Sequence, residues 1–264
     1  MVNSKQATLI RKELKGVVKG GRLFMDYMLV PLITAVVVPA ILILTIILME
    51  DGEQLEQILA VIPNSGAVAH EDFVIVSLLF NGFLPMIFLM TPIMVSTAMA
   101  AASFTGEKER RTLETLLYSP MSLREIFNAK VIGSFLLSMI VTLVSFSLMV
   151  VVIGLLVWIT LGEILVPGLA WLAILGLVAP AFAFIGIVFQ VRLSAKARNS
   201  QEAFQQAGVL VVPLVMLIVT QSTGLLMVNT WLLLAVGFGL AGVAWMIMRT
   251  AFKKFTYEKL LSND

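Results

Sequence analysis

The sequence predicts an all-α integral membrane protein with six transmembrane helices, and three observations carry this prediction. Hydrophobic residues make up 59% of the 264 residues and charged residues only 13%, which lies outside the usual range for soluble domains. Long stretches contain no Asp, Glu, Lys or Arg, and all Lys and Arg residues fall on one side of the resulting topology. Six spans of roughly 20 residues with short connections fill the chain, so no large soluble domain is expected.

Five uncharged stretches are each long enough to cross a hydrocarbon core of ~30 Å as a helix. They are Tyr27 to Met49, Phe73 to Gly106, Val131 to Gly162, Ile164 to Val191 and Ala203 to Met248. The last has polar breaks at Gln221 to Gly224 and Val228 to Thr230, which predict two helices joined by a tight hairpin. A short re-entrant piece between Met216 and Thr230 is the alternative. The predicted spans are about 24–49, 73–104, 131–161, 166–191, 205–226 and 230–249.

The basic residues predict the orientation, because an excess of Lys and Arg marks cytoplasmic loops. All 18 of them lie outside the spans, in segments that this topology places on the same side of the membrane. The opposite side has an acidic outer loop at residues 50–72 and two short turns without basic residues. We therefore expect a multi-pass protein of a prokaryotic cell (inner) membrane with both termini in the cytoplasm.

Residues 1–22 predict an amphipathic entry helix lying on the inner leaflet. Apolar side chains recur at helical spacing among basic ones, which is the pattern of an interfacial helix; they are Leu9, Ile10, Leu14, Val17 and Val18. A merely basic, frayed tail is the alternative. The apolar run that follows is longer than a secretory signal core, so we interpret it as a retained first span.

The segment between spans two and three, residues 105–126, is the most structured polar stretch, and we call it the elbow. Glu107 to Tyr118 favours helix with leucines at three- and four-residue spacing, and Pro120 stops that helix. Ser122 with Glu125 three residues later is a capping-box pattern that predicts a restart running into the third span. A helix, a break and a capped restart together predict a rigid projecting structure.

At this segment the chain resembles the ABC type-2 transporter permease family, which carries a Glu-rich stretch, a Thr-Leu-Glu-x-Leu-Leu core and a Pro followed by Ser or Thr. The resemblance makes the elbow a coupling helix that contacts a separate ATPase subunit, through Glu107, Glu109, Arg111, Thr112, Leu113, Glu114, Leu116, Leu117, Pro120, Ser122 and Glu125. Arg111 departs from the Gly that the family commonly has before the Thr. The alternative is an ordinary charged inner loop.

The same resemblance implies a permease subunit of an exporter rather than an enzyme. Its partners would be an ABC ATPase subunit, a second permease subunit in a homodimer or heterodimer, and the lipid bilayer. No GxxxxGK[ST] pattern occurs in the sequence, so the chain itself is expected to hold no cofactor, with ATP and Mg on the partner. The family handles many solutes, and the short final hairpin favours a hydrophobic drug or peptide.

A stand-alone secondary transporter or channel is the competing function. Proton relays need Asp, Glu or His within the membrane, and the span centres contain none. Asp26 lies near the inner boundary and is interpreted as a helix-end residue, while sodium coupling through carbonyls and hydroxyls stays open.

Enzymatic and nucleic-acid functions have little support in the sequence. The chain has no Cys and one His, His70, which stands in the outer loop without an HExxH pattern. Ser65 lacks a GxSxG context and is interpreted as a turn residue. A net charge of +2 gives no indication of nucleic acid.

Prolines inside the spans predict kinks and freed carbonyl groups, and they are Pro31, Pro39, Pro85, Pro92, Pro180 and Pro213. Gly237 with Ala241 predicts a close helix contact in the sixth span.

Overall fold

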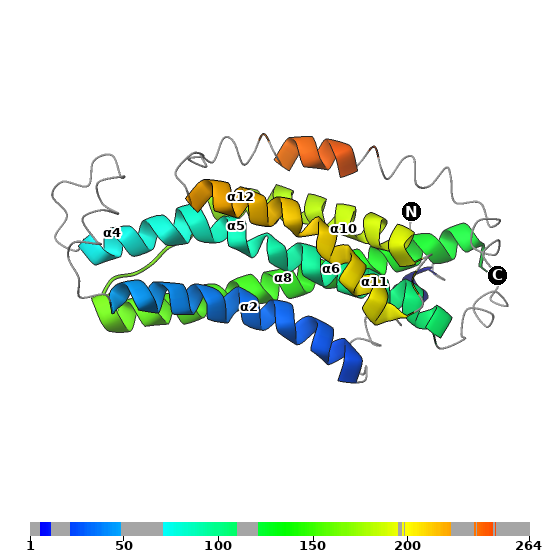
Figure 1. Ribbon diagram of the computed structural model, residues 1–264, viewed down its shortest axis with the longest axis horizontal. Coiled ribbons are helices and arrows are strands. Elements are labelled where there is room, and N and C mark those ends of the chain that lie inside the picture. Colours follow the sequence, from blue (N-terminus) through cyan, green and yellow to red (C-terminus); the bar gives the residue numbers. More distant parts are fainter. Residues whose placement is uncertain are drawn as a thin grey trace.

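The structure is a computed structural model that describes residues 6–11, 22–48, 71–109, 121–194, 197, 199–222, 235, 237–244 and 246. Regular elements within these ranges are all helices (Figure 1). Four helical stretches are long and apolar enough to cross a membrane: Leu29–Ile47, Asp72–Thr105, Glu125–Leu161 and Leu169–Ser194. They correspond to the first four predicted spans, so the all-helical membrane class is confirmed.

Spans one and three are long helices that lie side by side (Figure 1). Helix α2 (Arg22–Ile47) continues through Pro31 and Pro39 without a break. Helix α8 (Leu123–Leu161) begins before the uncharged stretch and is a single helix of 39 residues. It ends at Gly162, whose φ of 73° lies in the left-handed region that glycine adopts without a Cβ clash.

Spans two and four are each interrupted by a π-helical turn. Span two consists of α4 (Glu71–Leu78), a π turn (Leu79–Phe83), α5 (Leu84–Phe88) and α6 (Met90–Glu109). Span four consists of α9 (Leu169–Ala173), a π turn (Ile174–Val178) and α10 (Ala179–Ser194). Each π turn ends two residues before a proline, Pro85 or Pro180. A proline ring clashes with the carbonyl four residues earlier, and the wider π turn relieves that clash.

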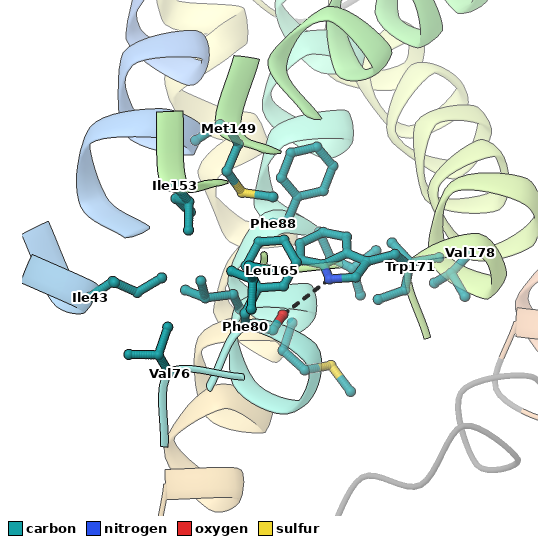
Figure 2. Close-up of a cluster of buried hydrophobic side chains, with 14 of the residues drawn as sticks. Ile43, Val76, Phe80, Phe88, Met149, Ile153, Leu165, Trp171 and Val178 are labelled. Atoms are coloured by element: carbon teal, nitrogen blue, oxygen red, sulfur yellow. Dashed lines mark hydrogen bonds between the residues drawn. The ribbon is translucent and has the colours of Figure 1, made fainter. Parts of the chain in front are cut away.

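The π turn of span two frees one carbonyl group, and span four supplies its partner. Leu84 donates its N–H to the carbonyl of Leu79, five residues earlier. In the same register the residue placed to donate to the Phe80 carbonyl is Pro85, but proline has no N–H. The indole Nε1 of Trp171 donates to the Phe80 carbonyl at 3.1 Å instead (Figure 2). This bond therefore joins spans two and four.

Asn81 makes a second link between the same two spans. Its Nδ2 donates to the Ser77 carbonyl at 3.1 Å, and its Oδ1 accepts the N–H of Gly168 at 2.7 Å. Gly168 is the residue just before α9. A Cβ atom at Gly168 would lie 3.0 Å from Asn81 Oδ1, so glycine allows this close approach. Asn81 thereby satisfies backbone groups of both helices.

A large apolar cluster surrounds the bond between Trp171 and Phe80 (Figure 2). Trp171 is fully buried, and its ring centroid lies 5.4 Å from that of Phe80, 5.5 Å from Phe88 and 5.0 Å from Phe146. Residues from α2 and α8 close the cluster, among them Ile43, Met149 and Ile153. The cluster thus gathers the first four spans into one packed bundle.

The long helices give the bundle two ends (Figure 1). We call the end formed by the last turn of α6 and the first turn of α8 the elbow end, and the end near Gly162 the Gly162 end. The hydrogen bonds of Trp171 and Asn81 that join spans two and four lie in the half toward the Gly162 end. Gly186 of α10 meets α6 midway, because a Cβ there would come within 2.5 Å of Ser96 Oγ.

The remaining predicted elements are described only in part. Residues 6–11 contain a helical segment in which Ile10 is buried, while the rest of the predicted entry helix before Arg22 lies outside the described residues. After span four come α11 (Ser200–Ala207), a 3₁₀ turn (Gly208–Leu210) and α12 (Val212–Ser222). Residues 50–70 of the outer loop and 223–230 of the last hairpin are also outside that range.

Described residues of the predicted sixth span contact the bundle, and Leu240 packs against the large apolar cluster. Residues 237–244 are helical, and a Cβ at Gly237 would come within 2.8 Å of Leu177 Cδ2. Gly237 is thus a point of close helix approach, as the small-residue pattern predicted. The count of six spans stays a prediction.

Trp171→Phe tests the link between spans two and four. The substitution keeps an aromatic ring but leaves the Phe80 carbonyl without its donor, so we expect the free energy of unfolding to fall by about 1–2 kcal/mol. Trp158→Phe is the control, since Trp158 is 59% exposed on the bundle surface. Denaturant titration in detergent measures both, and equal losses would contradict the assignment.

Candidate functional site at the elbow

The structure describes both edges of the elbow. Glu107 and Glu109 lie in the last turns of α6, which extends without a break from the second span. Ser122 and Glu125 lie at the start of α8. The other predicted coupling residues lie outside the described residues, and they are Arg111, Thr112, Leu113, Glu114, Leu116, Leu117 and Pro120.

A capping box fixes the point at which the chain re-enters a helix after the elbow. Ser122 is extended, with φ of −69° and ψ of 150°. Its Oγ accepts the Glu125 N–H at 3.3 Å, and its own N–H donates to Glu125 Oε2 at 2.9 Å. The Ser122 hydroxyl also donates to the same carboxylate oxygen at 2.9 Å. The predicted capping box is confirmed, and a carboxylate at this position also favours the helix dipole.

A buried lysine connects the two helices that flank the elbow. Lys130 of α8 is only 4% exposed, and its ammonium donates to the carbonyl oxygen of Ser103 on α6. The same nitrogen lies 5.3 Å from the centroid of the Phe104 ring, within cation–π range. Phe104 in turn packs on Phe127 of α8, with ring centroids 5.6 Å apart. We call these four residues the Lys130 brace.

Helix α10 packs against the braced pair. Ile187 and Val191 form a buried cluster with Ala100 of α6 and Val131 of α8. Three helices therefore converge beside the elbow, although only two of them are connected by it. A displacement of the elbow end of α6 and α8 must move α10 as well, because close-packed side chains transmit strain.

A second capped restart lies next to this site. Asn199 precedes α11, and its Oδ1 accepts the Glu202 N–H at 2.7 Å. Ala197 and Ala203 pack with Ala101 of α6 in a small buried cluster. The sequence carried a signal for this cap, since Asn followed three residues later by Glu is a helix-start pattern.

The arrangement supports a mechanical role for the elbow. Its described edges bring together a cap, a brace and a three-helix contact, whereas no group of three His, Cys, Asp or Glu side chains that could hold a metal lies within the described part of the chain. The described ends of α6 and α8 beside the elbow are thus held to each other and to α10.

The four described helices of membrane-spanning length fit a multi-pass membrane protein. The sequence matches the family described as ABC-2 family transporter protein over residues 7–231. The chain therefore belongs to the ABC-2 transporter family, as the Thr-Leu-Glu-x-Leu-Leu resemblance indicated, and it is the membrane component of an ABC-type transporter. A comparison with curated proteins found no match.

Ser122→Ala tests the cap that starts α8. It removes the acceptor for the Glu125 N–H, so we expect the free energy of unfolding to fall by about 1 kcal/mol. Amide exchange should also become faster in the first turn of α8. Ser147→Ala is the control, because the Ser147 hydroxyl is exposed and bonds only its own helix, at the Leu143 carbonyl. Unchanged exchange at residues 123–126 would show that the cap does not hold this turn.

Proposed function

We propose that this permease is a subunit of an ATP-driven exporter and that the elbow receives the force of a separate ATPase subunit. The observation that carries the proposal is the Lys130 brace. A loop that merely joined two spans would not require its flanking helices to be held together by a buried cation, an aromatic contact and a helix cap.

The proposed mechanism is a rigid-body movement. ATP-driven closure of two ATPase subunits, which bind ATP and Mg, pushes on the elbows of two permease subunits in a homodimer or heterodimer. Because α6, α8 and α10 pack together at the elbow end, each push tilts all three helices. The bundle then alternates between inward-facing and outward-facing states.

The distribution of charge supports the orientation that this mechanism requires. The elbow carries basic residues together with its acidic ones. The predicted outer loop and outer hairpins carry no basic residue. The positive-inside rule then places the elbow and both termini in the cytoplasm of a prokaryotic cell. Cytoplasmic ATP is available on that side.

A hydrophobic drug or peptide is the substrate class that we propose. The segment joining the last two predicted spans is short and leaves little room for the larger extracellular elements that large, polar substrates would need. The family admits many other solutes, so the choice between classes needs transport assays with each.

A stand-alone secondary transporter or channel is the second candidate. The buried hydroxyl side chains of α6 and α8 favour it, since hydroxyls and carbonyls can coordinate sodium. Reconstitution of the purified chain without an ATPase distinguishes the two. Solute uptake against a gradient driven by sodium or protons alone would support the second candidate and overturn the first.

Glu114→Lys combined with Leu116→Ala tests the docking role of the elbow. The pair reverses one charge and removes one apolar anchor, so we expect co-purification of the ATPase subunit to fall at least tenfold while membrane insertion is unchanged. Glu163→Lys with Ile164→Ala is the matched control at the Gly162 end, where Ile164 is 75% exposed. Undiminished co-purification of the elbow variant would overturn the assignment.

A further inference from the structure

Buried polar side chains are more numerous toward the elbow end of the bundle than toward the Gly162 end. Toward the Gly162 end the packed side chains are aromatic and aliphatic. Toward the elbow end the buried stripe of α8 is hydrophilic. Its members follow one another at three- and four-residue spacing and are Lys130, Ser134, Ser138 and Thr142; Ser145, just past the middle of α8, is the last polar residue of the stripe, and Met149, Ile153 and Val157 continue it.

Several buried polar groups of the described residues have no hydrogen-bond partner in the structure. Among the described residues, all but one of the unpaired buried side-chain atoms lie in the elbow-end half, and the exception is Ser145 Oγ. The atoms in the elbow-end half are Ser103 Oγ, Thr105 Oγ1, Asn128 Oδ1, Gln190 Oε1, Gln190 Nε2 and Ser194 Oγ. They come from α6, α8 and α10.

Gln190 is the centre of this set. Its side chain is fully buried, and neither its amide oxygen nor its amide nitrogen has a partner. A glutamine amide offers two donors and two acceptors, and burying it unpaired in an apolar interior is unfavourable. Neighbouring hydroxyls differ, because Ser96 and Thr97 both donate to the Ile93 carbonyl of their own helix.

The helix register places the unpaired groups around one three-helix contact. Ala100, Val131, Ile187 and Val191 form the buried contact of α6, α8 and α10. Ser103 follows Ala100 by one turn, Asn128 precedes Val131 by one turn, and Ser194 follows Val191 by one turn. All three steps lead toward the elbow end. Gln190 lies between Ile187 and Ser194 on α10, four residues after Gly186, whose missing Cβ lets α6 and α10 approach.

We propose that this part of the bundle is an internal water site, entered from the elbow end, in which water molecules join Gln190 and Ser194 to the polar groups of α6 and α8. Water is the occupant that fits, because each molecule can serve two to four partners and the unpaired groups include both donors and acceptors. The Lys130 ammonium and the Ser103 carbonyl form its border. The site is independent of the proposed direction of transport.

A hydrated contact differs mechanically from a packed one. Water-mediated hydrogen bonds can exchange partners as helices slide, whereas an interdigitated apolar surface resists small displacements. The contact can then take up small displacements while α6, α8 and α10 stay packed through Ala100, Val131, Ile187 and Val191. The two halves of the interior thus have different stiffness.

Cysteine accessibility tests the water site directly, because the natural chain contains no Cys and each introduced thiol is unique. Gln190→Cys and Ser194→Cys place thiols in the proposed site. Ile187→Cys and Val191→Cys are matched controls, since both residues are buried on the same helix within one turn. The probe is 2-sulfonatoethyl methanethiosulfonate, which reacts with thiols from water.

We expect the thiols at positions 190 and 194 to react at least tenfold faster than those at 187 and 191. Four similarly slow rates would show a dry polar core, and four similarly fast rates would show that α10 is open along its whole side. Either result would overturn the water site.

Radiolytic hydroxyl-radical footprinting tests the same site without any substitution. Met99 precedes Ser103 by one helical turn and is 3% exposed, while Met86 lies in the apolar half and is 4% exposed. Bound water generates radicals locally, so we expect Met99 to be oxidised several-fold faster than Met86 in the intact protein. Equal oxidation rates would contradict a water site beside Ser103.

Discussion

The contact between the Lys130 ammonium and the Ser103 carbonyl is the interaction on which the mechanical account depends. An ammonium that is almost fully buried must be compensated by acceptors or by an aromatic ring, and this one has both the carbonyl and the Phe104 face. The Ser103 carbonyl and the Phe104 ring belong to α6, although the lysine belongs to α8. Separating the two helices would break both of these contacts, so the brace opposes their separation.

A second constraint acts in the opposite half of the bundle. Pro85 has no N–H to donate to the Phe80 carbonyl, and Trp171 of span four supplies the missing donor. Asn81 adds a bond to the Gly168 N–H. Spans two and four are therefore joined near the Gly162 end by hydrogen bonds that compensate backbone groups, and near the elbow end by the packing of small and apolar residues. A push on the elbow is then received by one connected set of helices.

The sequence predicted the features that arise from local pattern. Uncharged stretches identified the first four spans because a bilayer requires about 20 apolar residues, and the spacing of Ser122 and Glu125 predicted the cap of α8. The π turns were not predicted, although the prolines that cause them were noted. The bond that compensates the Phe80 carbonyl could not be predicted either, since its donor, Trp171, lies 91 residues away along the chain. Lys130 closes the stretch that resembles the family motif and was counted among the cytoplasmic charges, but only its packing revealed a brace. The central coupling residues, Arg111 to Pro120, stay predictions.

One measurement tests the central claim most directly. It is the ratio of solute transported to ATP hydrolysed by the reconstituted permease–ATPase complex, compared between the natural chain and Lys130→Met. Met keeps most of the side-chain volume but removes the cation, so α6 and α8 would no longer be held together beside the elbow and the force would tilt them less effectively as one unit. We predict that ATPase binding and hydrolysis continue while the ratio falls several-fold, and that Lys130→Arg retains most of it. An unchanged ratio in Lys130→Met would contradict the claim that this brace connects the elbow to the spans.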